Sequence, residues 1–153
     1  MDIRTVMVAT DFSEASEPAV TLAFRLARAL GARVYIVHVV PQNDVQLMTA
    51  VSGQLQSYIK PETLVETYYA DADKRLTELV EHAQASDLIE ERLIVTGDPV
   101  DEIVSWATAK QAQILIVGTH GRSGLERFVL GSVAERVLRQ AQCAVLVVPV
   151  STT

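Results

Sequence analysis

Residues 113–141 read QILIVGTHGRSGLERFVLGSVAERVLRQA, and this stretch joins an apolar run to a helix-like run through a loop rich in glycine. The run QILIV has the Val and Ile content of a strand that is buried on both faces. After Ser132, the apolar residues Val133, Val137 and Leu138 recur at helical spacing. The glycines between them are Gly118, Gly121, Gly124 and Gly131. The stretch therefore predicts a strand, a glycine loop and a helix in that order.

The same change from strand-like to helix-like pattern recurs along the chain. Short runs rich in Val and Ile lie at residues 3–10, 33–40, 92–96, 113–118 and 144–149. Helical spacing of apolar residues is found at residues 13–30, at about 61–85, after Pro99 and at 132–140. This alternation predicts an α/β fold with an open, parallel, five-stranded Rossmann-like sheet of order 3-2-1-4-5 and helices on both faces. Residues 1–153 would form a single domain, in which residues 41–60 are a mobile loop or carry a short helix.

Two of the expected helices have recognisable ends. Ser13 can cap the helix at 13–30, Pro18 suits its first turn and Gly31 suits its end. Ser132 and Glu135 have the spacing of a capping box, so Ser132 has a plain structural explanation as an N-cap. The two roles of Ser132 are compatible, because a hydroxyl group at a helix start can also reach a phosphate.

The composition limits the classes of function. The formal net charge of −6 disfavours general binding to the phosphate backbone of nucleic acids. The single cysteine, Cys143, excludes an intramolecular disulfide and a cysteine metal cluster. We expect no secretory signal, because the start MDIRTVMVATDFSEAS lacks a long apolar region after a basic one. We expect no membrane span either, because no apolar run approaches the required length of about 20 residues. These features favour a cytoplasmic protein that binds neither nucleic acid nor membrane.

The glycine loop is expected where α/β sheets bind their ligands, beyond the carboxyl end of a strand. Glycine allows positive φ angles and a close approach of the backbone to a ligand. Free N–H groups in the loop, together with the start of the helix at Ser132, would attract an anion. The loop is not a P-loop, because GxxxxGK[ST] is absent, and GxGxxG is absent as well. Its spacing is Gly118-x2-Gly121-x9-Gly131-Ser132.

This spacing resembles G-x2-G-x9-G-[ST], the ATP-binding signature of universal stress proteins. Near the start, VMVATDFSEASEPA is similar to the first strand and Asp-bearing turn of that family. VYIVHVV resembles its second strand, and GSVAERVLRQAQCAVLVVPV resembles its last helix and strand. The resemblance covers the whole chain, and it implies an ATP-binding protein with a regulatory role in the response to stress.

The resemblance also assigns residues to the nucleotide. Asp11 and Val39 would hold the adenosine end, with Ala9 and Thr10 lining the same strand end. The ribose and phosphates would be wrapped by residues around the first glycine pair, which are Val117, Gly118, His120, Gly121, Arg122 and Ser123. The phosphates would also meet the helix start at Gly131, Ser132 and Val133. A Mg²⁺ or Mn²⁺ ion would be held by the phosphate oxygens.

Several of these residues also have a plainer explanation. Asp11 would accept hydrogen bonds from adenine or ribose, or it would serve the turn before the helix. Val39 would give the base an apolar wall, and it belongs to the strand core in either case. Arg122 is a cation near the phosphates or a solvated surface residue. His120 would donate to a phosphate or brace the loop.

The remaining reactive or aromatic side chains are expected to be structural. His38 is expected inside a strand and His82 on a helix surface, and the spacing of the histidines does not indicate a zinc site. Gly97-Asp98-Pro99 fits a tight turn that starts a helix. Trp106 fits packing, and Cys143 fits a buried, inert thiol.

The last apolar run points to a partner. In the order 3-2-1-4-5, AVLVVPV (144–150) lies at an edge of the sheet and carries no charge that would discourage pairing. Universal stress proteins, which the chain resembles, typically dimerise through the last strand. We therefore expect a homodimer paired through residues about 144–150, unless Pro149 and a covering loop protect the edge.

Three kinds of function stay open. The first is an ATP-binding regulatory protein. The second is an enzyme that hydrolyses ATP or transfers its phosphoryl group, but the chain offers no Walker lysine and no clear base, so any hydrolysis should be slow and no catalytic residue is assigned. The third is a dimeric scaffold with weak or no nucleotide binding. A sensor of AMP or cyclic AMP is a further alternative.

Overall fold

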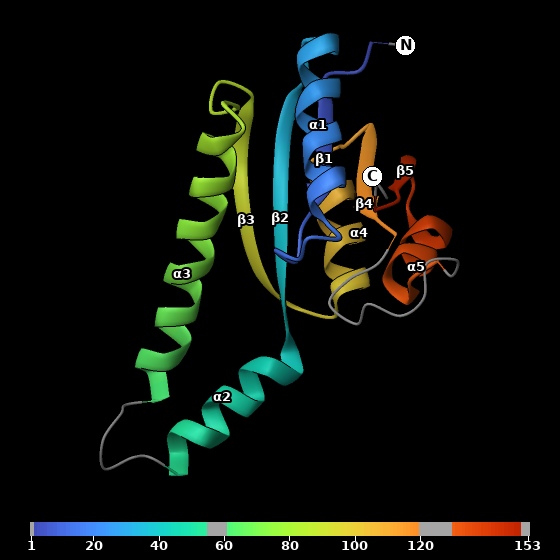
Figure 1. Ribbon diagram of the computed structural model, residues 1–153. Helices are drawn as coiled ribbons and strands as arrows, with labels where there is room; N and C mark the ends of the chain where they lie inside the picture. Colours follow the sequence, from blue (N-terminus) through green and yellow to red (C-terminus); the bar gives the residue numbers. More distant parts are fainter. Residues whose placement is uncertain (1, 55–60, 120–129, 151–153) are drawn as a thin grey trace.

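The computed structural model describes residues 2–54, 61–119 and 130–150. Its strands are β1 (Thr5–Ala9), β2 (Arg33–Pro41), β3 (Ile89–Gly97), β4 (Ile114–Gly118) and β5 (Ala144–Val148). Its helices are α1 (Glu17–Leu30), α2 (Gln42–Gln54), α3 (Pro61–His82), α4 (Pro99–Ala109) and α5 (Ser132–Gln140). All strand pairs are parallel and the order is β3-β2-β1-β4-β5, which confirms the predicted fold class (Figure 1).

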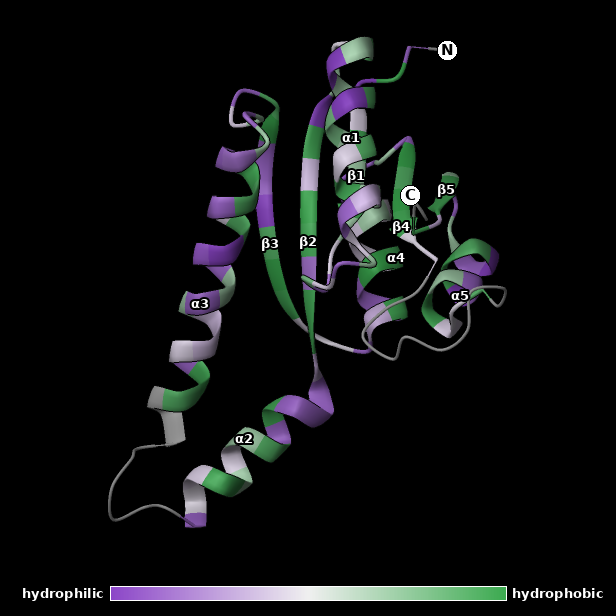
Figure 2. Ribbon diagram, in the orientation of Figure 1, coloured by the Kyte–Doolittle hydropathy of each residue, from purple (hydrophilic) through white to green (hydrophobic). Residues whose placement is uncertain are grey.

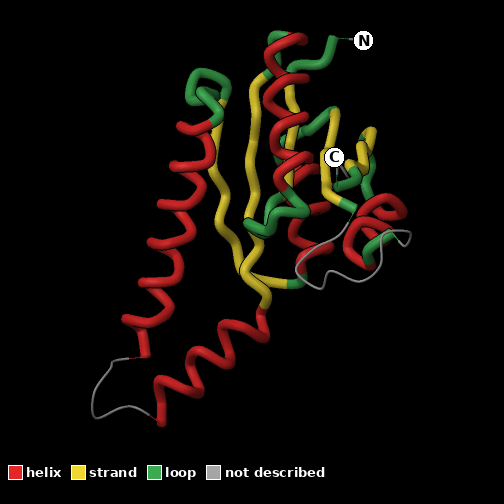
Figure 3. The backbone as a smooth tube through the Cα atoms, in the orientation of Figure 1, coloured by secondary structure: helices red, strands yellow, loops and turns green. Residues whose placement is uncertain are grey.

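Helices cover both faces of the sheet (Figure 3). On one face, α1 and α3 pack over strand residues such as Val6 and Ile36. On the other face, α4 and α5 pack over residues such as Met7 and Leu115. Successive residues of a strand point to opposite faces, so each central strand must be apolar throughout. The hydropathy colours of Figure 2 show this apolar character along β4.

The two ends of α1 differ in how well the sequence predicts them. Gly31 ends the helix as expected, with a left-handed φ of 66° and its N–H group donated to the carbonyl of Ala27. The prediction that Ser13 caps the helix is wrong, since α1 begins at Glu17. The N–H and hydroxyl groups of Ser13 are instead donated to Oδ1 of Asp11, which holds a turn before the helix.

The segment after β2 carries a helix rather than only a loop. Helix α2 covers residues 42–54 of the stretch 41–60 and packs against α3. Ser52 is buried there, and its hydroxyl donates to the carbonyl of Met48. Leu47 and Val51 are exposed on α2. Figure 1 shows α2 leaving the carboxyl end of β2 and extending away from the sheet. Within the described ranges, no helix is long and apolar enough to cross a membrane.

Strand β3 is longer than the run that predicted it. The expected strand was 92–96, but pairing with β2 extends from Ile89 to Gly97. The register of this pairing shifts between Val34 and Tyr35, which leaves an extra residue on β3 in the manner of a β-bulge. The charged residues 90–92 lie in this part of an edge strand, where the apolar pattern of a buried strand is not required.

Candidate functional site

The carboxyl ends of β1 and β4 form the ligand edge that a sheet of this order predicts. Val8 of β1 lies opposite Ile116 of β4, so the chain leaves both strands at the same level, after Ala9 and after Gly118. From β1 the chain continues to β2 on one side, whereas β4 lies on the other side. Ligands of open α/β sheets bind at such a switch point. The fold therefore brings Ala9, Thr10 and Asp11 to the same edge as Val117 and Gly118.

The side chain of Thr10 is used within the turn that follows β1. Thr10 is 5% exposed, its N–H group donates to the carbonyl of Val37, and its Oγ1 lies 3.0 Å from Oγ of Ser16. Oγ1 also accepts the N–H group of Phe12 at 3.1 Å. The carbonyl of Thr10 accepts from Nδ1 of the buried His38 at 2.9 Å. Thr10 therefore shapes the edge of the site through its turn.

Asp11 keeps part of its carboxylate available. Its Oδ1 accepts the N–H and hydroxyl groups of Ser13 at 3.0 and 2.5 Å, which is the turn role considered from the sequence. Within the described ranges, Oδ2 has no hydrogen-bond donor. Asp11 is also half-buried, so its carboxylate lies at the edge of the sheet without being fully hydrated. This arrangement serves the turn and leaves one oxygen that can accept from a ligand.

Val39 is part of the sheet as well as of the predicted site. It lies opposite Val95 of β3 and is half-buried against the core on the side of α4 and α5. Because β1 ends opposite Val37, the part of β2 that contains Val39 continues beyond the end of β1. Val39 therefore has the strand-core role considered from the sequence, and its contact with a base stays a prediction.

The residues at the two ends of the glycine loop are joined by a backbone hydrogen bond. The N–H group of Gly131 donates to the carbonyl of Thr119 at 2.7 Å, and the N–H group of Thr119 donates to the carbonyl of Val148 at 3.0 Å. Thr119 was not among the predicted site residues, although its place after Gly118 is the signal that would have found it. The predicted site residues within the loop lie outside the described residues, and these are His120, Gly121, Arg122 and Ser123.

The two described glycines of the signature do not have left-handed backbones. Gly131 has φ −60° and ψ 150°, and Gly118 is not among the described residues of positive φ. Any residue type can adopt such angles. Two reasons for glycine follow from the sequence, a positive φ angle and a close approach of the ligand to the backbone. Only the second can apply at Gly118 and Gly131, where the missing Cβ would make room for a ligand.

Among the residues that the structure describes, no side chain caps the start of helix α5. Gly131 is its N-cap residue, and Ser132 is the first helical residue, so the predicted capping box with Glu135 is wrong. The carboxylate of Glu135 instead pairs with Arg139 at 2.8 Å. The first N–H groups of a helix have no intrahelical acceptor, and both Ser132 and Val133 are exposed. The start of α5 therefore offers uncapped N–H groups and a positive dipole end to an anion.

The turn at residues 97–99 is structural. Oδ1 of Asp98 accepts the N–H groups of Val100 and Asp101 at 2.9 and 3.2 Å and so caps α4. These bonds, first that from Asp101, lower the pKa of Asp98 below its usual value. A Cβ atom on Gly97 would lie 2.7 Å from the side chain of Glu102, which would have to shift to make room for a larger residue. Arg136, in the middle of α5, lies 3.5 Å from Asp98, which ties α5 to the start of α4.

Trp106 has the packing role that the sequence predicts, whereas Cys143 is less buried than the sequence predicts. Nε1 of Trp106 donates to Glu102 at 3.2 Å within α4. Cys143 is half-buried, and its burial raises the pKa of the thiol. Among the residues that the structure describes, no group of three or more His, Cys, Asp or Glu residues is placed to hold a metal ion.

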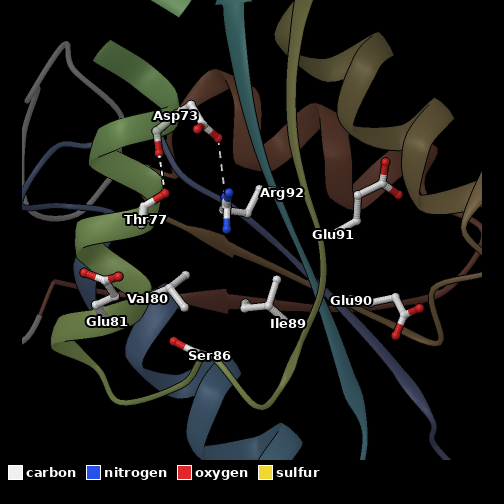
Figure 4. Close-up of a pocket in the computed structure, with 9 residues that line it drawn as sticks. All are labelled: Asp73, Thr77, Val80, Glu81, Ser86, Ile89, Glu90, Glu91 and Arg92. Atoms are coloured by element: carbon white, nitrogen blue, oxygen red, sulfur yellow. Dashed lines mark hydrogen bonds and ion pairs between the residues drawn. The ribbon is translucent and has the colours of Figure 1, made fainter. Parts of the chain in front are cut away.

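A polar hollow of about 420 Å³ lies between α3 and β3 (Figure 4). An ion pair between Asp73 and Arg92, at 3.4 Å, spans it. Residues 89–92 line it, and these form the first half of β3. The hollow is therefore remote from the carboxyl ends of the strands, where the Asp11 turn and the start of α5 lie, and we do not assign the ligand to it.

The chain is similar to proteins of one family along nearly its whole length. The sequence model of the universal stress protein family matches residues 2–149. Universal stress protein MJ0531 of Methanocaldococcus jannaschii is 33% identical over 145 residues, which cover 95% of this chain and 81% of that protein. A solved universal stress protein in complex with cAMP is 27% identical, with a TM-score of 0.65 over 99% of this chain and 100% of the other. A universal stress protein from Archaeoglobus fulgidus in complex with dAMP is also 27% identical, with a TM-score of 0.61 over 96% of this chain and 98% of the other.

Proposed function

The chain belongs to the universal stress protein family, and from this premise we propose that it binds an adenine nucleotide at the edge where β1 and β4 end. The observation that carries the proposal is the start of α5, which no described side chain caps and whose exposed first residues follow the hydrogen bond between Gly131 and Thr119. Such a helix start binds phosphate. The complexes of related universal stress proteins with cAMP and dAMP support an adenine nucleotide as the ligand class.

The residues of the site divide into two groups in this proposal. Asp11 and Val39 receive the adenosine end, since one carboxylate oxygen of Asp11 stays available and Val39 lies on the part of β2 that continues beyond the end of β1. The phosphates lie against Gly131, Ser132 and Val133, whose N–H groups begin α5. Gly118 lies between the two groups at the end of β4. Its missing Cβ would let the ribose or the first phosphate approach the backbone.

We propose ATP as the physiological ligand. The complete signature G-x2-G-x9-G-[ST] supports this choice, because the chain has it at Gly118, Gly121, Gly131 and Ser132. A Mg²⁺ or Mn²⁺ ion would be bound by the phosphate oxygens, the ligands that such hard cations prefer. Binding would regulate a partner in a cytoplasmic stress response, with at most slow hydrolysis of ATP.

A second candidate is a sensor of a nucleoside monophosphate or a cyclic nucleotide. The specific observation in its favour is that the two related complexes contain cAMP and dAMP. A ligand with one phosphate would meet the start of α5 without needing a divalent ion. The phosphate number therefore separates the two candidates.

We also propose that the active form is a homodimer paired through residues about 144–150. Strand β5 lies at one edge of the sheet, and Leu146 and Val150 are 39% and 43% exposed. Val133 and Leu138 of α5, a helix that packs against β5, are exposed as well. An apolar edge strand favours pairing with a second chain.

The experiment that tests the proposal is calorimetric titration of nucleotide-free protein with ATP, ADP, AMP and cAMP, with and without Mg²⁺. The control is a Gly118→Val, Gly131→Val double variant, which adds Cβ atoms where the described backbone has no left-handed φ. Its Tm shows whether the variant is folded. Binding by the wild type that is lost in a folded variant supports the proposal. Absence of binding for all four nucleotides would reject it and favour a dimeric scaffold.

A further inference from the structure

An aromatic and cationic cluster lies beside the Asp11 turn and comes from three parts of the chain. The ring centroid of Phe12 lies 4.3 Å from that of His38 on β2. The guanidinium carbon of Arg75, on α3, lies 4.4 Å from the centroid of Phe12. Tyr68 of α3 stacks on His38 with the ring centroids 6.5 Å apart. The residue next to Asp11 is therefore packed between β2 and α3.

The backbone of Phe12 has a conformation that its residue type disfavours. Its φ angle is 62°, in the left-handed region that bulky residues rarely occupy. Glycine or asparagine would adopt this φ angle at a lower cost. A strained conformation persists only where the surrounding structure fixes it. Here the fixing contacts are those of the ring with His38 and Arg75, so the ring has a role that the turn geometry alone does not explain.

The conformation of Phe12 determines how its neighbours are held. The N–H group of Phe12 donates to Oγ1 of Thr10 at 3.1 Å. The next N–H group, that of Ser13, donates to Oδ1 of Asp11 at 3.0 Å. On the other side of the turn, Nδ1 of His38 donates to the carbonyl of Thr10 at 2.9 Å. Moving the Phe12 backbone would therefore displace the hydrogen bonds that orient the carboxylate of Asp11.

We infer that Phe12 is a positioning residue of the nucleotide site, whose ring, held by His38 and Arg75, fixes the turn that presents Asp11 to the adenosine end. The inference rests on the proposed function, because Asp11 is taken to contact the nucleotide. It assigns Phe12 no contact with the ligand.

Binding of ATP to four variants tests the inference: Phe12→Gly, Phe12→Tyr, Asp11→Ala and the double variant Asp11→Ala, Phe12→Gly. Glycine suits the φ angle and removes the whole side chain with its ring, whereas tyrosine keeps a ring that can pack on His38 and Arg75. We expect Phe12→Gly to raise the Kd for ATP about tenfold, near the lower end for a lost hydrogen bond to a charged group, and Phe12→Tyr to change it less than about threefold. The double variant should bind no more weakly than Asp11→Ala. An unchanged Kd for Phe12→Gly, or fold-changes that multiply in the double variant, would overturn the inference.

Amide hydrogen exchange in the absence of nucleotide gives a second readout. In Phe12→Gly, the amide of Ser13 should exchange faster than in the wild type, because its acceptor Asp11 is no longer fixed. The amide of Val8, in the centre of β1, should exchange at the same rate in both proteins. Equal protection of Ser13 in the two proteins would overturn the inference. A wild type that binds no adenine nucleotide would instead reject the proposed function, and the exchange of Ser13 would still decide whether Phe12 fixes the turn.

Discussion

Replacing Ser132 by proline tests whether the backbone at the start of α5 holds a phosphate. Ser132 is the first residue of α5, and within the described ranges its N–H group donates to no acceptor. Proline lacks this N–H group but suits the first position of a helix. The residue before a proline must be extended, and Gly131 already has φ −60° and ψ 150°. The substitution therefore removes one donor while leaving the helix intact.

The variant Ser132→Ala is the matched comparison, since it removes only the hydroxyl group and keeps the N–H group. A hydrogen bond from an N–H group to a charged acceptor contributes about 1.5–3 kcal/mol. The Kd for ATP of Ser132→Pro should therefore exceed that of Ser132→Ala by roughly one to two orders of magnitude. The free energy of unfolding should differ between the two by less than about 0.5 kcal/mol, as for other surface changes.

Calorimetric titration with ATP and Mg²⁺ gives the two Kd values, and urea denaturation gives the two stabilities. Equal Kd values at equal stability would refute the reasoning, because the N–H group of Ser132 would then make no contact with a phosphate. A larger Kd that accompanies a large loss of stability would also count against it, since the geometry of Gly131 predicts that proline is tolerated.

Four further expectations concern stability, reactivity and assembly. Asp98→Ala should lower the free energy of unfolding by about 1 kcal/mol in urea denaturation, because it removes the N-cap of α4, whereas Asp98→Asn keeps the cap. Folding lowers the pKa of Asp98, so the ionised carboxylate adds to the free energy of unfolding above its unfolded pKa of about 3.9, and this addition is lost as the pH falls through the folded pKa. The stability of Asp98→Asn should not show this dependence on acid. Leu76→Ala should cost about 2–5 kcal/mol because this side chain is 0% exposed between α3 and the sheet, and a cost below about 1 kcal/mol would contradict the packing. Burial raises the pKa of the Cys143 thiol, so a disulfide reagent at pH 8 should label the native protein more slowly than the urea-unfolded protein, and equal rates would count against this. Leu146→Lys should convert the proposed dimer into a folded monomer in light scattering, whereas a wild type that is already monomeric at micromolar concentration would rule out pairing through β5.

The sequence predicts the sheet well because buried parallel strands and packed helices leave strong local patterns. QILIVG and AVLVV are continuous apolar runs, and β4 and β5 coincide with them to within one residue. Helix α2 has a weaker signal, since its sequence QNDVQLMTAVSGQ mixes polar residues with a glycine. It is helical where it packs against α3, and tertiary packing of this kind overrides a weak propensity.

The site is less predictable than the sheet because local hydrogen bonds compete for the same side chains. Ser13 suits an N-cap by type, but it donates to Asp11 and the helix begins four residues later, at Glu17. Ser132 suits a capping box, but Gly131 occupies the cap position. The importance of Phe12 has no local signal, since it depends on a φ angle and on contacts with residues of β2 and α3.

The central position of β1 determines when the sheet can be completed during synthesis. β1 precedes the other strands of this sheet along the chain, and it pairs with β2 on one side and with β4 on the other. Until residues 114–118 are synthesised, the second side of β1 has no partner, and its apolar residues Val6–Val8 border an open strand edge. Open apolar edges favour aggregation. A chain interrupted after β3 should therefore aggregate or be retained by chaperones. Once β4 has been synthesised, both edges of β1 can be paired.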